Sequence, residues 1–426
     1  MLDCLHYIMQ YKSNFTIWYR NCSISEVDKN LKEQFMRNLL KLRFLWTFLT
    51  LFLVLSLIAG GCGKKEKKEE AKSATKQEVA QKASEEKVIK IGAILPLTGP
   101  LSFLGEPGKN AIELLKDKLT NENIQIILYD SKGDAKTGLT AFQKAYNVDK
   151  VKIVLTTLTN ISLSIKPAAK ENHVMQVIIA IYPNIASDYR LALQFCYNAV
   201  KETEVIKSYI EKKKPKKIFF FASRDGITNL QVKEYFIPWL KKRRIQAEVE
   251  WFDVGTKDFK TLVTKFGASA ANLGILLGYG SDFQGILREI ANYGLTEKVP
   301  LIGGIGYLEL PQYVKYELVK NSVFIVPKFL VSKVGSQRYE EFRDNYKKHF
   351  GKEPTYDAAY TYDAVWTLLE AVKNIKSDDV EKIVQYILSN VLEGVTGPIE
   401  FEYDGTLKVD VILARFDEKM NIILAE

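Results

Sequence analysis

From residue 88 onwards, continuous apolar runs alternate with amphipathic stretches along the chain. Residues 88–97 (VIKIGAILPL) form an apolar run of the kind that is buried on both faces of a parallel sheet. The pattern then predicts a helix at 108–119, a strand at 124–130, a helix at 137–148, a strand at 151–155, a helix at 164–172 and a strand at 174–181. Strands and helices alternating at this spacing indicate right-handed βαβ units around a parallel sheet.

The same alternation restarts after a predicted linking helix at 201–213. It predicts strands at 216–223, 246–254, 272–279, 299–304 and 323–327, with helices at 231–243, 257–266 and 283–294. Helices follow at 339–350 and 357–375, and short strands at 397–405 and 408–418 end the pattern. The sequence therefore predicts an α/β fold of two similar lobes. The chain crosses between them more than once, and their junction forms a cleft of the kind that binds small ligands.

The region before residue 88 follows a different pattern. An apolar run at 44–61 ends in small residues and Cys62, and Arg37, Lys41 and Arg43 precede it. A transmembrane anchor is the alternative, because the run is close to the roughly 20 residues that span a bilayer. A basic start, an apolar centre and a small-residue exit favour a secretory signal. The stretch resembles a bacterial lipoprotein signal, although Ala59 stands where leucine is usual.

That resemblance implies cleavage before Cys62 and attachment of a lipid to its sulfur. It also implies a start at Met36, so that residues 1–35 are an over-extended reading frame and 36–61 the signal peptide. Residues 62–87 are rich in Lys and Glu and almost lack large apolar side chains, which predicts a flexible tether. We therefore expect a lipid-anchored domain in the cell envelope, outside the cytoplasm.

Charge and motifs exclude several classes of function. The formal net charge is +9, but Lys and Glu alternate along much of the chain and no basic stripe with aromatic residues stands out, so no nucleic-acid partner is expected. With Cys4 and Cys22 removed, only Cys62 and Cys196 remain, which rules out a disulfide framework. The three histidines are scattered, and no metal or cofactor is predicted. Residues 303–309 (GGIGYLE) lack the spacing of a dinucleotide loop, and no nucleophile elbow is present, so no enzyme is expected.

Hydroxyl and amide side chains crowd residues 155–164 (LTTLTNISLS), directly after the apolar run at 151–154. Ser, Thr and Asn at such a place can simply close a turn or cap a helix. The same position also lies beyond the carboxyl end of a parallel strand, where ligands bind in open α/β sheets. The pattern alone leaves both readings open.

Five stretches in order resemble the branched-chain amino-acid binding proteins of bacterial ABC importers. They are residues 89–115 (IKIGAILPLTGPLSFLGEPGKNAIELL), 129–146 (YDSKGDAKTGLTAFQKAY), 252–266 (FDVGTKDFKTLVTKF), 359–372 (AYTYDAVWTLLEAV) and 394–409 (GVTGPIEFEYDGTLKV). The resemblance implies a type 1 periplasmic-binding fold, with two Rossmann-like lobes and a multi-stranded hinge. It divides the chain into a first lobe of 88–200 plus about 328–375 and a second lobe with hinge of 201–327 plus about 376–426.

The resemblance also implies a function and a set of site residues. A monomer would bind a small molecule between its lobes, close over it and dock on a membrane permease. Counting back from Pro167 places the ligand's carboxylate on Ser162, and an error of register would place it on Thr159 or Ser164. The remaining expected contacts are Leu104, Ala180, Tyr182, Tyr279 and Ile305; Leu104 and Tyr279 could instead belong to the core.

Ile305 departs from the family pattern, since relatives that bind α-amino acids have a glutamate there to pair with the ammonium. Glu309, Asp282 and Asp225 are other candidate anions. Because a buried ammonium without a carboxylate is unfavourable, we predict a carboxylate or amide ligand rather than a standard α-amino acid. The alternative function is a lipoprotein of the same fold that acts as a sensor or as a partner of cell-envelope proteins, with a cleft filled by its own side chains.

Overall fold

The structure is a computed structural model that describes residues 88–331 and 336–425. The predicted over-extended start, signal peptide, lipidation site at Cys62 and tether lie outside the described residues. Within the described ranges, no helix combines the length and the apolar character that crossing a bilayer requires.

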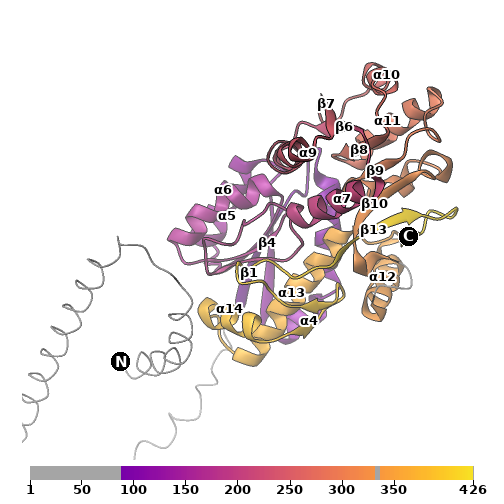
Figure 1. The fold of residues 1–426 in the computed structure, drawn as a ribbon. Helices are drawn as coiled ribbons and strands as arrows, with labels where there is room; N and C mark the ends of the chain where they lie inside the picture. The colour runs from indigo at the N-terminus through magenta and orange to yellow at the C-terminus, as the bar shows by residue number, and fades with distance from the viewer. Residues whose placement is uncertain (1–87, 332–335, 426) are drawn as a thin grey trace, which may run out of the picture. The chain divides into compact units, whose positions relative to one another are not determined.

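The first sheet has five parallel strands in the order β2-β1-β3-β4-β5. Figure 1 shows β1 and β4 of this sheet in the indigo to purple part of the chain. The strands are β1 (Ile89–Leu95), β2 (Ile124–Asp130), β3 (Ile153–Thr157), β4 (Met175–Ile179) and β5 (Ala192–Gln194). The helices that alternate with them are α3 (Ser102–Glu113), α4 (Lys116–Asn121), α5 (Ala135–Asn147) and α6 (Thr159–Glu171). Every residue of β3 and β4 is buried, as expected for continuous apolar strands covered by helices on both faces.

The second sheet has seven strands in the order β14-β13-β10-β9-β8-β6-β7. They are β6 (Lys217–Ser223), β7 (Gln246–Phe252), β8 (Leu273–Leu277), β9 (Leu301–Gly303), β10 (Ser322–Pro327), β13 (Val411–Phe416) and β14 (Ile422–Leu424). Strands β6 to β10 pair in parallel, whereas β13 and β14 add an antiparallel edge. Side chains of β6 alternate between two cores: Phe219 and Phe221 belong to one, and Ile218 and Phe220 to the other.

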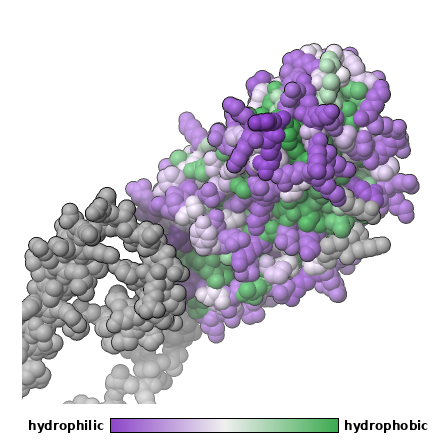
Figure 2. Space-filling model, viewed as in Figure 1, coloured by the Kyte–Doolittle hydropathy of each residue, from purple (hydrophilic) through white to green (hydrophobic). Residues whose placement is uncertain are grey.

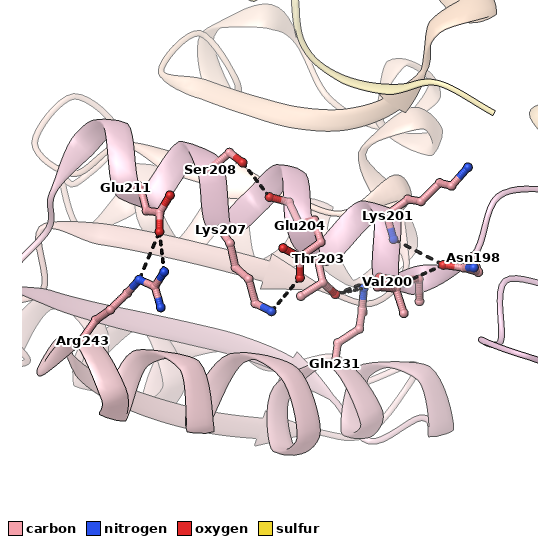
Figure 3. A network of polar contacts seen from close by, with 11 residues as sticks. Asn198, Val200, Lys201, Thr203, Glu204, Lys207, Ser208, Glu211, Gln231 and Arg243 are labelled. Carbon is pink, nitrogen blue, oxygen red and sulfur yellow. Dashed lines mark hydrogen bonds and ion pairs between the residues drawn. The ribbon is translucent and has the colours of Figure 1, made fainter. Parts of the chain in front are cut away.

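Helices and short helical turns cover the second sheet. They are α7 (Ala199–Lys213), α8 (Gly226–Leu230), the π-helical turn η2 (Gln231–Phe236), α9 (Ile237–Arg243), α10 (Lys260–Ala268), α11 (Gly280–Asn292), and the 3₁₀ turns η3 (Ile305–Gln312) and η4 (Tyr316–Leu318). The 3₁₀ turn η5 (Lys328–Leu330) follows β10 and packs Phe329 into the core of the first lobe. Helix α7 lies beside η2 and α9 (Figure 3). Gln231 of η2 is directed at Thr203 of α7, and Arg243 of α9 pairs with Glu211 at 2.7 Å.

The C-terminal helices return to the first lobe. These elements are α12 (Gln337–Phe350), α13 (Tyr356–Ile375), α14 (Val380–Ser389) and the two-stranded ribbon of β11 (Leu392–Glu393) and β12 (Pro398–Ile399). Helix α13 packs on α3, and α14 packs on α13. Ile383 and Ile387 of α14 and Ile399 of β12 belong to the same buried core as the first sheet. This packing differs from the predicted boundary at residue 375, which assigned α14 to the second lobe; its apolar stripe is buried against α13 instead.

The chain passes between the two cores at three places: after β5, after β10, and between β12 and β13. Backbone hydrogen bonds join these connections. Leu407 donates to the carbonyl of Gln194 at 2.9 Å, and Lys328 donates to the carbonyl of Asp410 at 2.9 Å. The visible surface is mostly hydrophilic, with smaller apolar patches between the charged side chains (Figure 2).

Candidate ligand-binding site

A cavity of about 520 Å³ lies between the two sheets, and residues of both lobes line it. Its walls are the segments that follow β3, β4, β6, β8 and β9, together with residues of α7, η2 and the start of α13. Ligands of open parallel sheets bind at the carboxyl ends of the strands, and this cavity faces those ends in both sheets. Its volume lies within the range of small-molecule sites, roughly 300–1,000 Å³.

Six of the seven predicted contact residues line this cavity: Leu104, Thr159, Ala180, Tyr182, Tyr279 and Ile305. Ser162 is not among the lining residues. It is fully buried one turn inside α6, where its hydroxyl lies 2.9 Å from that of Thr156. Thr159 occupies the start of the helix, so the cavity lining favours Thr159 over Ser162 as a contact. That the six lining residues contact a ligand stays a prediction.

The N-terminus of α6 opens into the cavity. Leu158 occupies the N-cap position with φ at 69° and offers no side-chain cap. The first backbone N–H groups of a helix have no acceptor within it, and the helix dipole makes this end favourable for an anion. Thr159 and Asn160, the first two residues of α6, line the cavity. A left-handed conformation at a leucine costs about 1–3 kcal/mol, and such strain is concentrated at functional sites.

Thr157 is a lining residue that the sequence prediction missed. It is the last residue of β3, it is only 4% exposed, and its hydroxyl has no hydrogen-bond partner within the described residues. A buried hydroxyl without a partner is unfavourable unless a ligand satisfies it. The hydroxyl-rich stretch at 155–164 includes Thr157, but the resemblance to the family favoured Ser162 within it. In the structure, the polar residues of this stretch that line the cavity are Thr157, Thr159 and Asn160.

Four carboxyl groups line the cavity: Glu202, Asp225, Glu309 and Asp357. Burial is the main cause that raises the pKa of Glu202, Glu309 and Asp357, each to about 7. The negative charge of Glu309 raises the pKa of Asp357 further. Burial and the neighbouring acids also raise the pKa of the Tyr279 hydroxyl. Nothing in the sequence patterns pointed to Glu202 or Asp357, because each lies within an ordinary amphipathic helix.

The glycine-rich stretch at 303–306 packs closely against Glu202 of α7. The Glu202 carboxylate accepts hydrogen bonds from the backbone N–H of Ile305 at 3.0 Å and from Gln231 Nε2 at 3.2 Å. A Cβ atom on Gly304 would lie 2.4 Å from this carboxylate, so only glycine allows the approach. The glycines of residues 303–306 (GGIG) therefore allow the buried Glu202 to pack against the backbone here.

The argument that Ile305 leaves the site without a carboxylate is wrong. The 3₁₀ turn η3 begins at Ile305 and brings Glu309 to the cavity as well. Glu309 Oε2 accepts the backbone N–H of Gly280 at 3.1 Å. Asp282, another candidate anion, is buried away from the lining and accepts the N–H of Gly255 at 2.8 Å. The absence of glutamate at position 305 therefore does not exclude a ligand with an ammonium group.

The protein has two lobes built on parallel sheets, joined by three connections, with a cavity at the carboxyl ends of the strands. This arrangement defines a type 1 periplasmic-binding fold. A sequence model of the family described as periplasmic binding protein matches residues 88–421. The chain belongs to this family, and within it to the branched-chain amino-acid type of the ABC importers. Members of this family are extracytoplasmic ligand-binding proteins rather than enzymes.

The relatives share sequence along most of their length. A Leu/Ile/Val-binding protein of Citrobacter freundii is 25% identical over 352 residues, which cover 76% of this chain and 89% of the relative. The structure of a leucine-binding protein from Thermotoga maritima superposes with a TM-score of 0.70 at 22% identity, covering 80% of this chain and 98% of that one. A solute-binding protein from Rhodopseudomonas palustris in complex with 3,4-dihydroxybenzoic acid gives 0.69 at 17% identity, covering 79% and 95%.

Proposed function

We propose that this protein is the solute-binding component of an ABC importer, which captures a small organic solute in the cavity and delivers it to a membrane permease. The cavity carries the proposal, because both lobes contribute to it and it is not filled by the protein's own side chains. The alternative, a sensor or envelope partner of the same fold, was expected to have a filled cleft. The lipid anchor on Cys62 and a monomeric state belong to the same proposal.

Closure of the lobes is the expected consequence of binding. The connections between the lobes are short and are joined by backbone hydrogen bonds near Gln194, Leu407 and Asp410. Hinge bending at a few connecting residues allows two rigid lobes to close around a ligand. A solute held at the start of α6 and by Tyr279 and Glu309 would contact both lobes at once, which favours the closed form.

The polar groups at 157–160 suit a carboxylate or another hydrogen-bond acceptor. The predicted restriction to a carboxylate or amide, however, rested on the missing glutamate at position 305. A relative from Thermotoga maritima is a leucine-binding protein, and one from Rhodopseudomonas palustris binds an aromatic acid. Both kinds of solute carry a carboxylate, which is the feature that we assign to the N-terminus of α6.

A solute screen tests the proposed function. The purified full chain is unfolded and refolded to remove any bound solute, and its melting temperature is measured with amino acids, organic acids, amides and amines. A solute at 100 times its dissociation constant adds about 2.7 kcal/mol to the free energy of unfolding. The melting temperature should then rise by several degrees. If no small solute raises it, the importer proposal fails and the envelope-partner alternative is favoured.

The Thr157→Val variant is expected to bind the solute about fivefold more weakly, because a hydrogen bond to the ligand is worth roughly 1 kcal/mol. Its folding stability should not fall, since the hydroxyl has no partner within the described protein. The matched control is Thr367→Val, which removes another fully buried hydroxyl without a partner, at a place that does not line the cavity. Titration calorimetry measures both affinities; equal affinities in the two variants would contradict a ligand contact at Thr157.

A further inference from the structure

We propose that the adjoining C-terminal ends of α7 and α9, on the second lobe, bind the anionic surface of a lipid membrane. We name this surface the α7–α9 patch and define it by the exposed cations Lys212, Lys213, Lys214, Lys241, Lys242 and Arg244. The inference goes beyond the proposed function, because it concerns the outer surface of one lobe and not the cavity between the two.

The fold brings two basic segments of the chain together at this place. Helix α7 ends at Lys214 and α9 ends at Arg244, and both residues have the left-handed backbone that stops a helix. Strands β6 and β7 follow these helices directly and pair with each other in parallel. An ion pair of 2.7 Å between Glu211 and Arg243 joins the last turns of the two helices (Figure 3). The two basic ends therefore form one surface.

The positive charge of the α7–α9 patch is not neutralised by the described part of the protein. None of its six cations forms an ion pair with a described residue. Two acids of α7 are already paired with other cations, Glu211 with Arg243 at 2.7 Å and Glu204 with Lys207 at 2.8 Å. Like charges held this close together repel one another. A negatively charged partner would relieve that repulsion.

Stabilisation of the helices does not require so many cations. A basic side chain in the last turn interacts favourably with the helix dipole. In α4 and α13 a single lysine has this position, Lys118 and Lys373 respectively. The α7–α9 patch instead gathers three unpaired cations at each of two neighbouring helix ends. The excess charge favours binding of a polyanion as the role of this surface.

The aromatic rings next to the patch do not favour a nucleic acid as that polyanion. The guanidinium of Arg243 lies 4.1 Å from the ring centre of Trp239, and Lys207 Nζ lies 5.8 Å from it. Lys233 Nζ lies 5.4 Å from the ring centre of Trp251. Single-stranded nucleic acids bind by stacking their bases on free aromatic rings. A base stacked here would have to displace cations of the protein.

The absence of an apolar centre favours a membrane over a protein partner. Among the described residues, none of the exposed large apolar side chains belongs to α7, η2 or α9. Interfaces between proteins normally bury an apolar core, whereas anionic membranes attract clusters of about four to eight Lys or Arg through charge alone. The α7–α9 patch has a cluster of this size. Members of the family are extracytoplasmic, where anionic lipid head groups form such a charged surface.

The α7–α9 patch and the cavity lie at opposite ends of the second sheet. The cavity is lined by segments that follow the carboxyl ends of β6, β8 and β9. The patch lies instead where α7 and α9 lead into the amino ends of β6 and β7. None of its six residues lines the cavity. Membrane binding at the patch therefore leaves the solute-binding groups unchanged.

Sedimentation of the purified full chain with lipid vesicles tests the inference. One set of vesicles contains phosphatidylcholine and phosphatidylglycerol in equal amounts, and the other contains phosphatidylcholine alone. The patch variant combines Lys212→Gln, Lys241→Gln and Lys242→Gln. The control variant combines three substitutions of exposed lysines, each in the last turn of its helix on the first lobe: Lys118→Gln, Lys348→Gln and Lys373→Gln. Residues 1–87 are the same in all three proteins, so their contribution cancels in the comparison.

We expect the original protein to prefer the vesicles that contain phosphatidylglycerol, and this preference should decrease as the salt concentration rises. The patch variant should bind these vesicles at least about tenfold more weakly, because each cation near an anionic membrane contributes roughly a factor of five. The control variant, which has the same net charge as the patch variant, should bind like the original protein. Melting curves show that each variant is folded.

Three results would overturn the inference. The first is equal binding of both vesicle types by the original protein. The second is an equal loss of affinity in the patch and control variants, which would show that net charge and not the α7–α9 patch is responsible. The third is loss of binding to soluble polyphosphate in the patch variant while its vesicle binding is unchanged, which would replace the membrane by a soluble polyanion. The solute screen does not depend on any of these results, so the proposed function is tested separately.

Discussion

The Asp363→Ala variant is expected to lose about 3–5 kcal/mol of folding stability, the cost of leaving buried polar groups without their charged partner. Asp363 is fully buried on α13. Its carboxylate accepts the backbone N–H groups of Val395 at 2.7 Å and Thr396 at 2.8 Å, and the hydroxyl of Thr396 at 2.6 Å. It thereby holds the β11–β12 ribbon against the first lobe, and its removal should release this ribbon.

Chemical denaturation measures the effect. The control is Asp344→Ala on α12, whose carboxylate is exposed and lies 3.4 Å from Arg343 Nη2, a surface pair expected to contribute less than about 1 kcal/mol. A loss below 1 kcal/mol in Asp363→Ala would show that the ribbon does not depend on this carboxylate. Affinity for the solute should change little in a variant that remains folded, because Asp363 does not line the cavity.

The second large effect is a fall in stability of the ligand-free protein as the pH rises. The pKa values of Glu202, Glu309 and Asp357 are raised to about 7 in the folded state, mainly by burial. In the unfolded chain these groups have ordinary values near 4. Between these limits the folded protein binds more protons than the unfolded chain, so its free energy of unfolding decreases as the pH increases. We expect a loss of at least about 2 kcal/mol from pH 5 to pH 8.

Exposed acids with a lowered pKa affect folding stability only at pH values below the range from 5 to 8. Hydrogen bonds from Thr137 hold the pKa of Asp134 below its usual value, and the bond from Lys166 does the same for Asp188. Their contribution is lost only as the pH falls below the ordinary value near 4. Melting curves at several pH values give the trend, and Glu202→Gln should flatten it. A stability that is constant or rises from pH 5 to pH 8 would contradict the raised pKa values.

The sequence predicted the fold well because the buried strands are continuous apolar runs. The predicted strand at 124–130 matches β2, and the two-lobe α/β architecture is confirmed. Helix α14 was missed although its buried residues Val380, Ile383, Val384 and Ile387 have the i, i+3, i+4, i+7 spacing of an amphipathic helix. Its packing on α13 in the first lobe is a tertiary contact that a local pattern does not reveal. The helix predicted at 108–119 is two helices, α3 and α4, since the chain turns at 114–115.

Six of the seven predicted site residues line the cavity, whereas Ser162 does not. Tyr279 and Ile305 line the cavity because each is the second residue after the end of a strand, and ligand sites in such sheets lie beyond strand ends. Ser162 was predicted by counting residues back from Pro167. The helix α6 instead begins after Leu158, whose backbone has a positive φ, and the amino-acid sequence alone does not reveal this conformation. Asp357 lies far along the chain from every other lining acid. Only the packing of α13 against the first lobe brings it to the cavity.

The passage of the chain through both cores also has a consequence for how the protein is made. The first sheet is complete once β5 has been synthesised, but α13 and α14, which cover part of it, are among the last segments to follow. Asn110 of α3, for example, bonds to Tyr346 of α12 across 236 residues of sequence. Contacts between such distant segments slow folding and leave apolar surface exposed in the meantime. The first lobe therefore begins synthesis first but completes its folding only when the C-terminal helices have been made. We expect a chain released before that point to aggregate through the uncovered face of the first sheet.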